Sequence, residues 1–260
     1  MNHHRVPLLA FLLFCPSAAM AGGFAGEVLY SAGRVVSSPA RISKEDLPAI
    51  GAVAAGGLAL YSLDGQLRHG FLKNRSKLND DISRNAEKLG NGGYDAAIVA
   101  GYGGLGLLLK DPYMQDTALL AAESFLAANT AGTLLKYTAG RARPYAEDGK
   151  RRFTPFKFKT ARTSFPSGHT VSAFSVASVF AARAESTVVK VLAYSLASSV
   201  AFQRVYADKH WASDVLAGAA IGTAVGRWVA AKKTKSGPPS AMLLPVYSPG
   251  YAGAAAMLSF

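Results

Sequence analysis

Three clusters of charged and nucleophilic side chains lie between Lys136 and Asp214, and together they have the residue types that phosphate chemistry needs. The first is a K-x6-R-P pattern that joins Lys136 to Arg143. The second is a P-S-G-H pattern that ends at His169, and the third is an R-x5-H-x3-D pattern that begins at Arg204. Each cluster alone has an ordinary explanation, as a solvated helix end, a helix cap or a surface ion pair. Their order along one chain predicts a shared site.

Fixed positive charge is the first requirement of phosphoryl transfer, because the equatorial oxygens of the phosphoryl group are negative. Lys136, Arg143 and Arg204 are three cations that can neutralise this charge. Ser167 and Gly168 lead into an expected helix, whose first N–H groups attract an anion. Glycine lets the backbone approach closely, and the serine adds a hydroxyl. We therefore predict that these five residues bind the phosphate.

Two histidines supply the reactive groups. His210 and Asp214 are four residues apart, so on one helical face the carboxylate would accept the Nδ1 proton and leave Nε2 free to attack. His169 is then available as the general acid for the leaving oxygen. The predicted catalytic residues are His210, His169 and Asp214. No metal-ligand cluster accompanies them, so we expect neither a metal nor another cofactor.

These clusters resemble the signature of the type 2 phosphatidic acid phosphatase superfamily, which is K-x6-R-P, P-S-G-H and S-R-x5-H-x3-D. The superfamily includes lipid phosphate phosphatases, undecaprenyl diphosphate phosphatases, class A acid phosphatases and vanadium haloperoxidases. One departure is Gln203, where the family usually has Ser. The resemblance implies an all-α fold with the site at one end of the core helices. It also implies a phosphohistidine at His210, acid and base roles for His169, and cationic side chains in place of a divalent ion.

The function expected from these residues is metal-independent hydrolysis of phosphate monoesters or diphosphates. We favour a lipid-linked substrate of the phosphatidate or polyprenyl diphosphate type. One alternative is a vanadate-dependent haloperoxidase with the same pocket, although haloperoxidases of this superfamily are typically longer chains. Another is a non-catalytic, basic envelope protein that binds anionic lipid through residues 136–162. The intact acid, nucleophile and carboxylate favour catalysis, and no nucleic-acid partner is expected.

Helices are the elements expected to position the site. Hydrophobic residues make up 50% of the 260 and charged residues 17%, and alternating strand patterns are scarce. Apolar helical segments are expected at Leu47–Leu63, Tyr94–Leu109, Thr117–Tyr137, Thr170–Arg183, Thr187–Tyr206 and Trp211–Ala231. The fold class is therefore all-α. We predict a bundle of about six core helices within residues 22–235, after a loosely ordered lead-in over residues 22–44. Residues 236–260 would form a tail with a short β-hairpin.

Glycines recur every fourth residue after Asp214, at Gly218, Gly222 and Gly226. They would share one helix face and let that helix approach a neighbour closely, below the site. A G-x-G-x-x-G pattern from Gly101 is followed six residues later by Pro112 and has no βαβ context with an acidic residue, so we interpret it as helix packing.

The N-terminus predicts export. Arg5, an apolar run over residues 6–14 and small residues up to Ala21 are typical of a secretory signal peptide, here residues 1–21. Cleavage would remove the chain's single cysteine, Cys15. We expect a periplasmic location.

Membrane association is expected from the charge of +12, which is concentrated between Lys136 and Arg162 and would attract anionic headgroups. The longest uninterrupted apolar helices are rich in Ala, and the segment Thr117–Tyr137 carries Glu123 and Asn129. The sequence therefore favours peripheral over integral attachment and leaves both open, as it does the oligomeric state.

Overall fold

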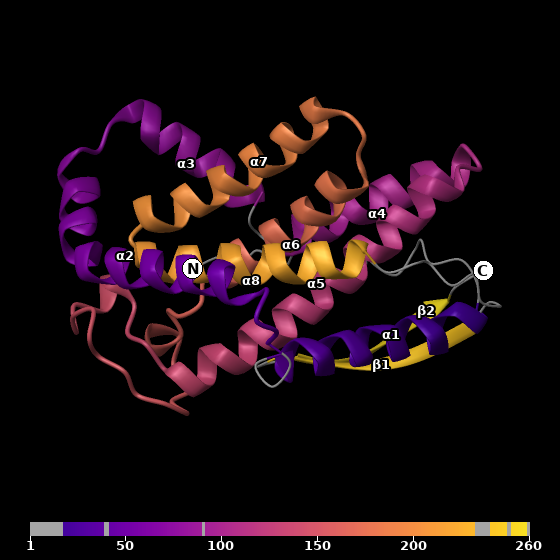
Figure 1. Ribbon diagram of the computed structural model, residues 1–260, viewed down its shortest axis with the longest axis horizontal. Coiled ribbons are helices and arrows are strands. Elements are labelled where there is room, and N and C mark those ends of the chain that lie inside the picture. Colours follow the sequence, from indigo (N-terminus) through magenta and orange to yellow (C-terminus); the bar gives the residue numbers. More distant parts are fainter. Residues whose placement is uncertain (1–17, 39–41, 90–91, 232–239, 249–250, 259–260) are drawn as a thin grey trace.

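The computed structural model describes residues 18–38, 42–89, 92–231, 240–248 and 251–258. Its helices are α1 (Ala18–Val36), α2 (Leu47–Lys73), α3 (Lys77–Leu89), α4 (Gly92–Leu108), α5 (Pro112–Ala139), α6 (Gly168–Arg183), α7 (Thr187–Tyr206) and α8 (Ala212–Ala230). Two short 3-10 helices, Pro144–Ala146 and Thr160–Arg162, interrupt the long connection between α5 and α6. After α8, the strands β1 (Ser240–Ser248) and β2 (Tyr251–Leu258) pair antiparallel beside α1 (Figure 1).

Helix α6 is the centre of the bundle, where it packs against α5, α7 and α8 (Figure 1). The glycine face of α8 makes this packing close. A Cβ at each of its glycines would lie too near a carbonyl oxygen of α6 or its cap: 2.7 Å from Ser167 at Gly218, 2.6 Å from Val171 at Gly222 and 2.5 Å from Ser175 at Gly226. The predicted close approach of the glycine stripe is confirmed.

Helix α5 has defined signals at both ends. The Asp111 side chain accepts hydrogen bonds from the first N–H groups of the helix, and Pro112 occupies the first turn. Gly140 ends the helix with a left-handed φ of 59°, and a side chain there would strike the backbone of Thr154. The chain therefore turns sharply after the last turn of α5, which carries Lys136.

The ends of four helices meet on one side of the bundle. The chain runs out along α5, back along α6, out along α7 and back along α8. The C-terminal ends of α5 and α7 therefore lie beside the N-terminal ends of α6 and α8. All three motifs of the sequence fall at these ends or in the loops between them.

The all-helical class is confirmed, and each of the six segments expected from the apolar pattern forms a helix. Helices α1 and α3 are additional. Residues 22–36 were expected to be loosely ordered, and this is wrong, because α1 continues to Val36 and buries Phe24, Ala25 and Ala32. The segment is rich in Gly, which has a low helix propensity, so its composition concealed a helix that packs on α5.

The predicted signal peptide stays a prediction. Its apolar core, residues 6–14, lies outside the described residues, and the expected cleavage after Ala21 falls within α1.

Among the described helices, α2 and α5 are long and apolar enough to cross a membrane. Helix α2 runs ten residues beyond the segment that the sequence indicated, and Asp64 is its buried residue. In α5, Glu123 is buried and accepts a hydrogen bond from Ser31, while Asn129 bonds to Phe125 and Ser172. One reason for preferring peripheral attachment is therefore removed, because these polar groups of α5 have partners inside the bundle.

Candidate active site

The structure brings the predicted site residues together. Lys136 lies on the last turn of α5, His169 on the first turn of α6, and Arg204 on the last turn of α7. Arg143 and His210 lie in the loops that follow α5 and α7. These side chains are close enough for the charges of Lys136 and Arg143 to lower the pKa of both histidines.

The ammonium group of Lys136 lies at the N-terminus of α6. Its Nζ donates to the carbonyl oxygens of Pro166 at 2.8 Å and Thr163 at 3.2 Å. It also lies 3.7 Å from the point where a Cβ on Gly168 would be. The absent side chain of Gly168 thus leaves the helix N-terminus open beside a fixed cation, which suits an anion.

Arg143 has a buried donor without an acceptor. Its Nη2 is 3.4 Å from Thr163 Oγ1, whereas its Nε is buried and has no partner among the described residues. An unsatisfied buried donor is costly, so this nitrogen is suited to bind an oxygen of a ligand.

Arg204 is held by two acceptors. Its Nε donates to the side-chain oxygen of buried Gln203, and its Nη2 is 3.2 Å from Glu87 of α3. Gln203 stands where the family usually has Ser, and its amide oxygen orients the guanidinium. The sequence had no signal for Glu87, because α3 is far away along the chain.

Ser167 is buried directly before α6. Its N–H donates to the carbonyl oxygen of Asp214 at 3.1 Å, and its Oγ accepts from Thr170 at 2.9 Å. The hydroxyl proton of Ser167 thus remains available to a ligand, beside the first N–H groups of α6 at Gly168 and His169, which geometry leaves without intrahelical acceptors.

His210 is buried, and its Nδ1 lies 2.6 Å from the carbonyl oxygen of Ser164. A carbonyl can only accept, so Nδ1 carries the proton and Nε2 has the free lone pair. Asp214 Oδ2 is 4.0 Å from Nδ1, so the direct hydrogen bond expected from the sequence is wrong. The expectation assumed one helical face, but α8 begins at Ala212, after His210.

Asp214 is connected to His210 through Ser164, whose side chain bonds to Asp214 and whose carbonyl oxygen bonds to His210. Its Oδ2 accepts from Ser164 Oγ at 2.5 Å and from the Trp211 N–H at 3.1 Å. Its Oδ1 accepts from Arg141 Nη1 at 2.6 Å. The carboxylate therefore fixes both the residue that orients His210 and the first turn of α8.

Asp64 and Arg141 are site residues that the sequence analysis missed. Arg141 is fully buried, with Nη2 at 2.7 Å from Asp64 Oδ2 and with Asp214 on its other side. Asp64 also accepts from the N–H and hydroxyl of Ser213 at 3.0 and 2.6 Å. A lone carboxylate after the apolar part of α2 was a usable signal for a buried partner. Arg141 gave none, because it lies among solvated cations.

Arg68, one turn after Asp64 on α2, holds the two site loops. Its Nε lies 2.7 Å from Asp208, in the loop before His210, and its Nη2 lies 2.5 Å from Glu147, in the loop after Arg143. Helix α2 therefore braces the site through one polar face, although most of its surface is exposed.

Both histidines are neutral at pH 7. Burial, followed by Arg204, Arg143 and Lys136, lowers the pKa of His169 to about 3. Burial and the same Arg143 and Lys136 lower the pKa of His210 well below its ordinary value. A neutral His210 is the nucleophilic form, whereas His169 must gain a proton before it can act as an acid.

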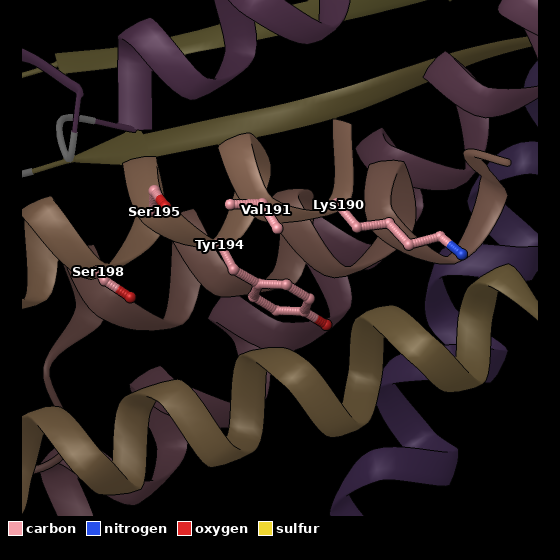
Figure 2. A pocket seen from close by; sticks show the side chains of 5 residues that line it. All are labelled: Lys190, Val191, Tyr194, Ser195 and Ser198. Carbon is pink, nitrogen blue, oxygen red and sulfur yellow. The ribbon is translucent and has the colours of Figure 1, made fainter. Parts of the chain in front are cut away.

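A surface hollow on α7 lies apart from this site. Figure 2 shows the side chains that line it, which are Lys190, Val191, Tyr194, Ser195 and Ser198. Even Ser198 precedes Arg204 by six residues, or about 9 Å along the helix. The hollow contains no residue of the three motifs.

Comparison with known proteins relates this geometry to a family. Residues 117–237 match the model of the PAP2 superfamily. Lipid A 1-phosphatase of Porphyromonas gingivalis is 42% identical over 93 residues, which are 35% of this chain and 18% of that protein. The match thus spans less than a fifth of that relative.

Two solved structures are also similar. A transmembrane PAP2-type phosphatidylglycerolphosphate phosphatase from Bacillus subtilis has a TM-score of 0.54 and 21% identity, covering 68% of this chain and 92% of that chain. LpxE of Aquifex aeolicus has a TM-score of 0.48 and 22% identity, covering 64% and 94%. The first likeness supports the fold. The resemblance to the PAP2 superfamily is therefore confirmed for residues 117–237, which match the family model and contain all three motifs at one end of the bundle.

Proposed function

We propose that this chain is a phosphatase that hydrolyses a lipid-linked phosphate through a phosphohistidine at His210. The observation that carries the proposal is the tautomer of His210. The Ser164 carbonyl holds the proton on Nδ1, so the lone pair of Nε2 is free, and the cations of Arg143 and Lys136 lie nearby.

The reaction would take two steps. His210 Nε2 attacks phosphorus, the bond to the leaving oxygen breaks, and His169 gives that oxygen a proton. His169 then takes a proton from water, which attacks phosphorus and breaks the P–N bond. The carbonyl of Ser164 would stabilise the Nδ1–H of the phosphorylated imidazole throughout.

Charge on the transferred group would be neutralised by Lys136, Arg143 and Arg204, with further donors from Ser167 and the N-terminus of α6. The unpaired Nε of Arg143 is ready for one oxygen. The described residues contain no cluster of His, Cys, Asp and Glu that could hold a metal ion. We assign the neutralisation of this charge to these cations and to the N–H groups at the start of α6.

A lipid substrate is supported by the surface around the site. Helix α2 exposes Leu47, Ile50, Val53 and Leu58, and the apolar stretch ends at Asp64, whose partner is Arg141. We propose that α2 and α5 lie in the membrane, with the site at their ends facing the periplasm. The relatives described above that are named as lipid phosphatases support this substrate class.

The test of function is phosphate release by purified protein in detergent. We expect phosphatidate, phosphatidylglycerophosphate, lipid A or polyprenyl diphosphate to be cleaved with a higher kcat/KM than a soluble ester. His210→Ala should lower kcat by more than about a thousandfold, because no other group forms the covalent intermediate.

The matched control is His69→Ala, which removes an exposed histidine of α2 and should leave turnover unchanged. A His210→Ala protein that retains a tenth of wild-type turnover would contradict the assignment of the nucleophile.

A further inference from the structure

Residues 151–159, which we call the aromatic–basic loop, combine exposed aromatic rings with exposed cations. Its three phenylalanines are 44, 66 and 75% exposed at Phe153, Phe156 and Phe158. Its four cations are also exposed: Arg151, Arg152, Lys157 and Lys159. Three large apolar rings facing outward on one short loop require a partner surface.

The loop has a defined conformation. Phe153 pairs with Arg141 in a β-bridge, the Thr154 N–H donates to the Gly140 carbonyl at 2.9 Å, and the Phe156 N–H donates to the Tyr137 carbonyl at 2.8 Å. Phe156 has a left-handed φ of 58°, which a bulky residue rarely adopts. The backbone is thus held in an unfavourable conformation that leaves this ring outside the core.

The charge around the loop has one sign. No Asp or Glu occurs from residue 149 to residue 184, so the four cations of the loop are not neutralised by nearby residues in the chain. Such a surface is complementary to an anionic one.

The loop continues an apolar surface at the end of α5. The ring of Phe158 lies 4.8 Å from the ring of Tyr137, and Leu134 and Leu135 on the preceding turn are exposed. Lys136 lies between these residues and points into the site. The loop and the phosphate-binding cation therefore share one level at the end of α5, a helix long and apolar enough to span a membrane.

We propose that the aromatic–basic loop inserts Phe156 and Phe158 into the interface of an anionic bilayer, while its cations bind the lipid headgroups. Aromatic and basic side chains are favoured together at this depth, where rings reach the acyl boundary and cations meet phosphates. The contact sets the site at the level of lipid phosphates. The inference rests on the proposed attachment of α2 and α5 to the membrane, and it is independent of the proposed hydrolysis.

The test uses tryptophan as a depth probe in the full chain, in nanodiscs containing brominated lipids. Phe156→Trp and Phe158→Trp are each made in a His210→Ala background, so that no lipid is consumed, and the signal of Trp211 and Trp228 is subtracted with the parent protein. Leu78→Trp is the control, because Leu78 is an exposed residue of the polar helix α3.

We expect bromine to quench at least twice as much fluorescence at the two loop positions as at Leu78. Quenching should increase when phosphatidylglycerol replaces part of the phosphatidylcholine, and Lys157→Gln with Lys159→Gln should abolish that increase. Equal quenching at the loop and at Leu78, or a protein that does not migrate with the nanodisc, would overturn the proposal. Failure of hydrolysis alone would not change the quenching, so the two proposals can be separated.

Discussion

Arg141 differs from the other cations near the site because its charge is already neutralised. It is buried between Asp64 and Asp214, and its guanidinium lies 4.9 Å from the Tyr61 ring and 5.6 Å from that of Trp211. An oxyanion therefore has no access to it. Its role is to fix the start of α8, and through Asp214 the orientation of His210.

Asp64→Asn should show this positioning role. Removing one charge from a buried pair costs about 3 kcal/mol of unfolding free energy, and slight misplacement of the nucleophile lowers kcat by about tenfold or more. We expect KM to change little, because Asp64 does not face the phosphate. The measurements are thermal unfolding in detergent and steady-state kinetics.

Glu147→Gln is the matched control, because it also removes a carboxylate that pairs with an arginine of the site region. The Glu147 side chain is 73% exposed, so solvent screens its pairing with Arg68 and its loss should leave the melting temperature nearly unchanged. An Asp64→Asn protein with wild-type melting and kcat would argue against the positioning role.

His169 should take up a proton when phosphate binds. Its pKa is about 3, because burial and three cations oppose a positive charge. A bound anion offsets those cations and raises the pKa, so the affinity for inorganic phosphate should increase as pH falls from 8 to 6. Calorimetry in two buffers with different ionisation enthalpies measures the uptake. The His169→Gln variant should lose this proton uptake. Equal uptake by the variant and the unmodified protein would show that another group takes the proton.

The sequence was sufficient for the residues that we propose to bind the phosphate and insufficient for those that support them. Lys136, Arg143, His169 and His210 stand in motifs whose chemistry is visible from residue type and spacing. The partner of Arg141 lies 77 residues away on α2, and such a pairing exists only after the bundle has assembled. The direct hydrogen bond expected between His210 and Asp214 was wrong for a similar reason. Because α8 begins only after His210, the acceptor beside Nδ1 is the Ser164 carbonyl.

At the scale of secondary-structure elements, the contact of α6 with α8 should be the most sensitive to added volume. Gly222→Ala would place a methyl group 2.6 Å from the Val171 carbonyl and 2.9 Å from Ser175 N, and backbone atoms of a central helix move only together. We expect a loss of about 2 kcal/mol or more and a lower Tm.

Gly57→Ala is the control for this substitution. Gly57 also lies in a helix, α2, but nothing lies within 4 Å of its added Cβ. Alanine is more favourable than glycine inside a helix by up to about 1 kcal/mol, so the Tm of this variant should be unchanged or higher. An equal Tm for the two variants would show that α8 can move away from α6 without loss of stability.

Helix positions followed from the apolar pattern, but their lengths and two further helices did not. The second half of α2 is polar because it braces the site with Asp64 and Arg68, so its composition resembled a loop. Among the described side chains of helix α3, Ser83 and Ala86 are buried, and most of the others are polar, so the helix has no apolar stretch that stands out. Local pattern fails where a helix is stabilised by tertiary partners rather than by its own apolar stripe.

At the scale of the whole molecule, exposed apolar surface also extends along the helices to the end of the bundle that is distant from the charged site. Leu108 and Leu109 at the end of α4 and Val188 and Val191 at the start of α7 are exposed, far along the bundle from the motif residues. A chain in water would not gain from this distribution, whereas a chain in a bilayer would.

The whole molecule should therefore behave as an integral membrane protein, contrary to the preference drawn from the sequence. Salt removes proteins held by headgroup attraction, because it screens the cations of residues 151–159. Alkaline carbonate removes peripheral proteins but leaves those whose helices are buried in the acyl chains. We expect full retention in cell membranes through both washes, measured by immunoblot.

A variant with Leu58→Asp and Val53→Asp on the exposed face of α2 should be extracted, because a buried carboxylate costs several kcal/mol in the bilayer. Release of the unmodified chain by salt alone would restore peripheral attachment, with the basic surface as the anchor.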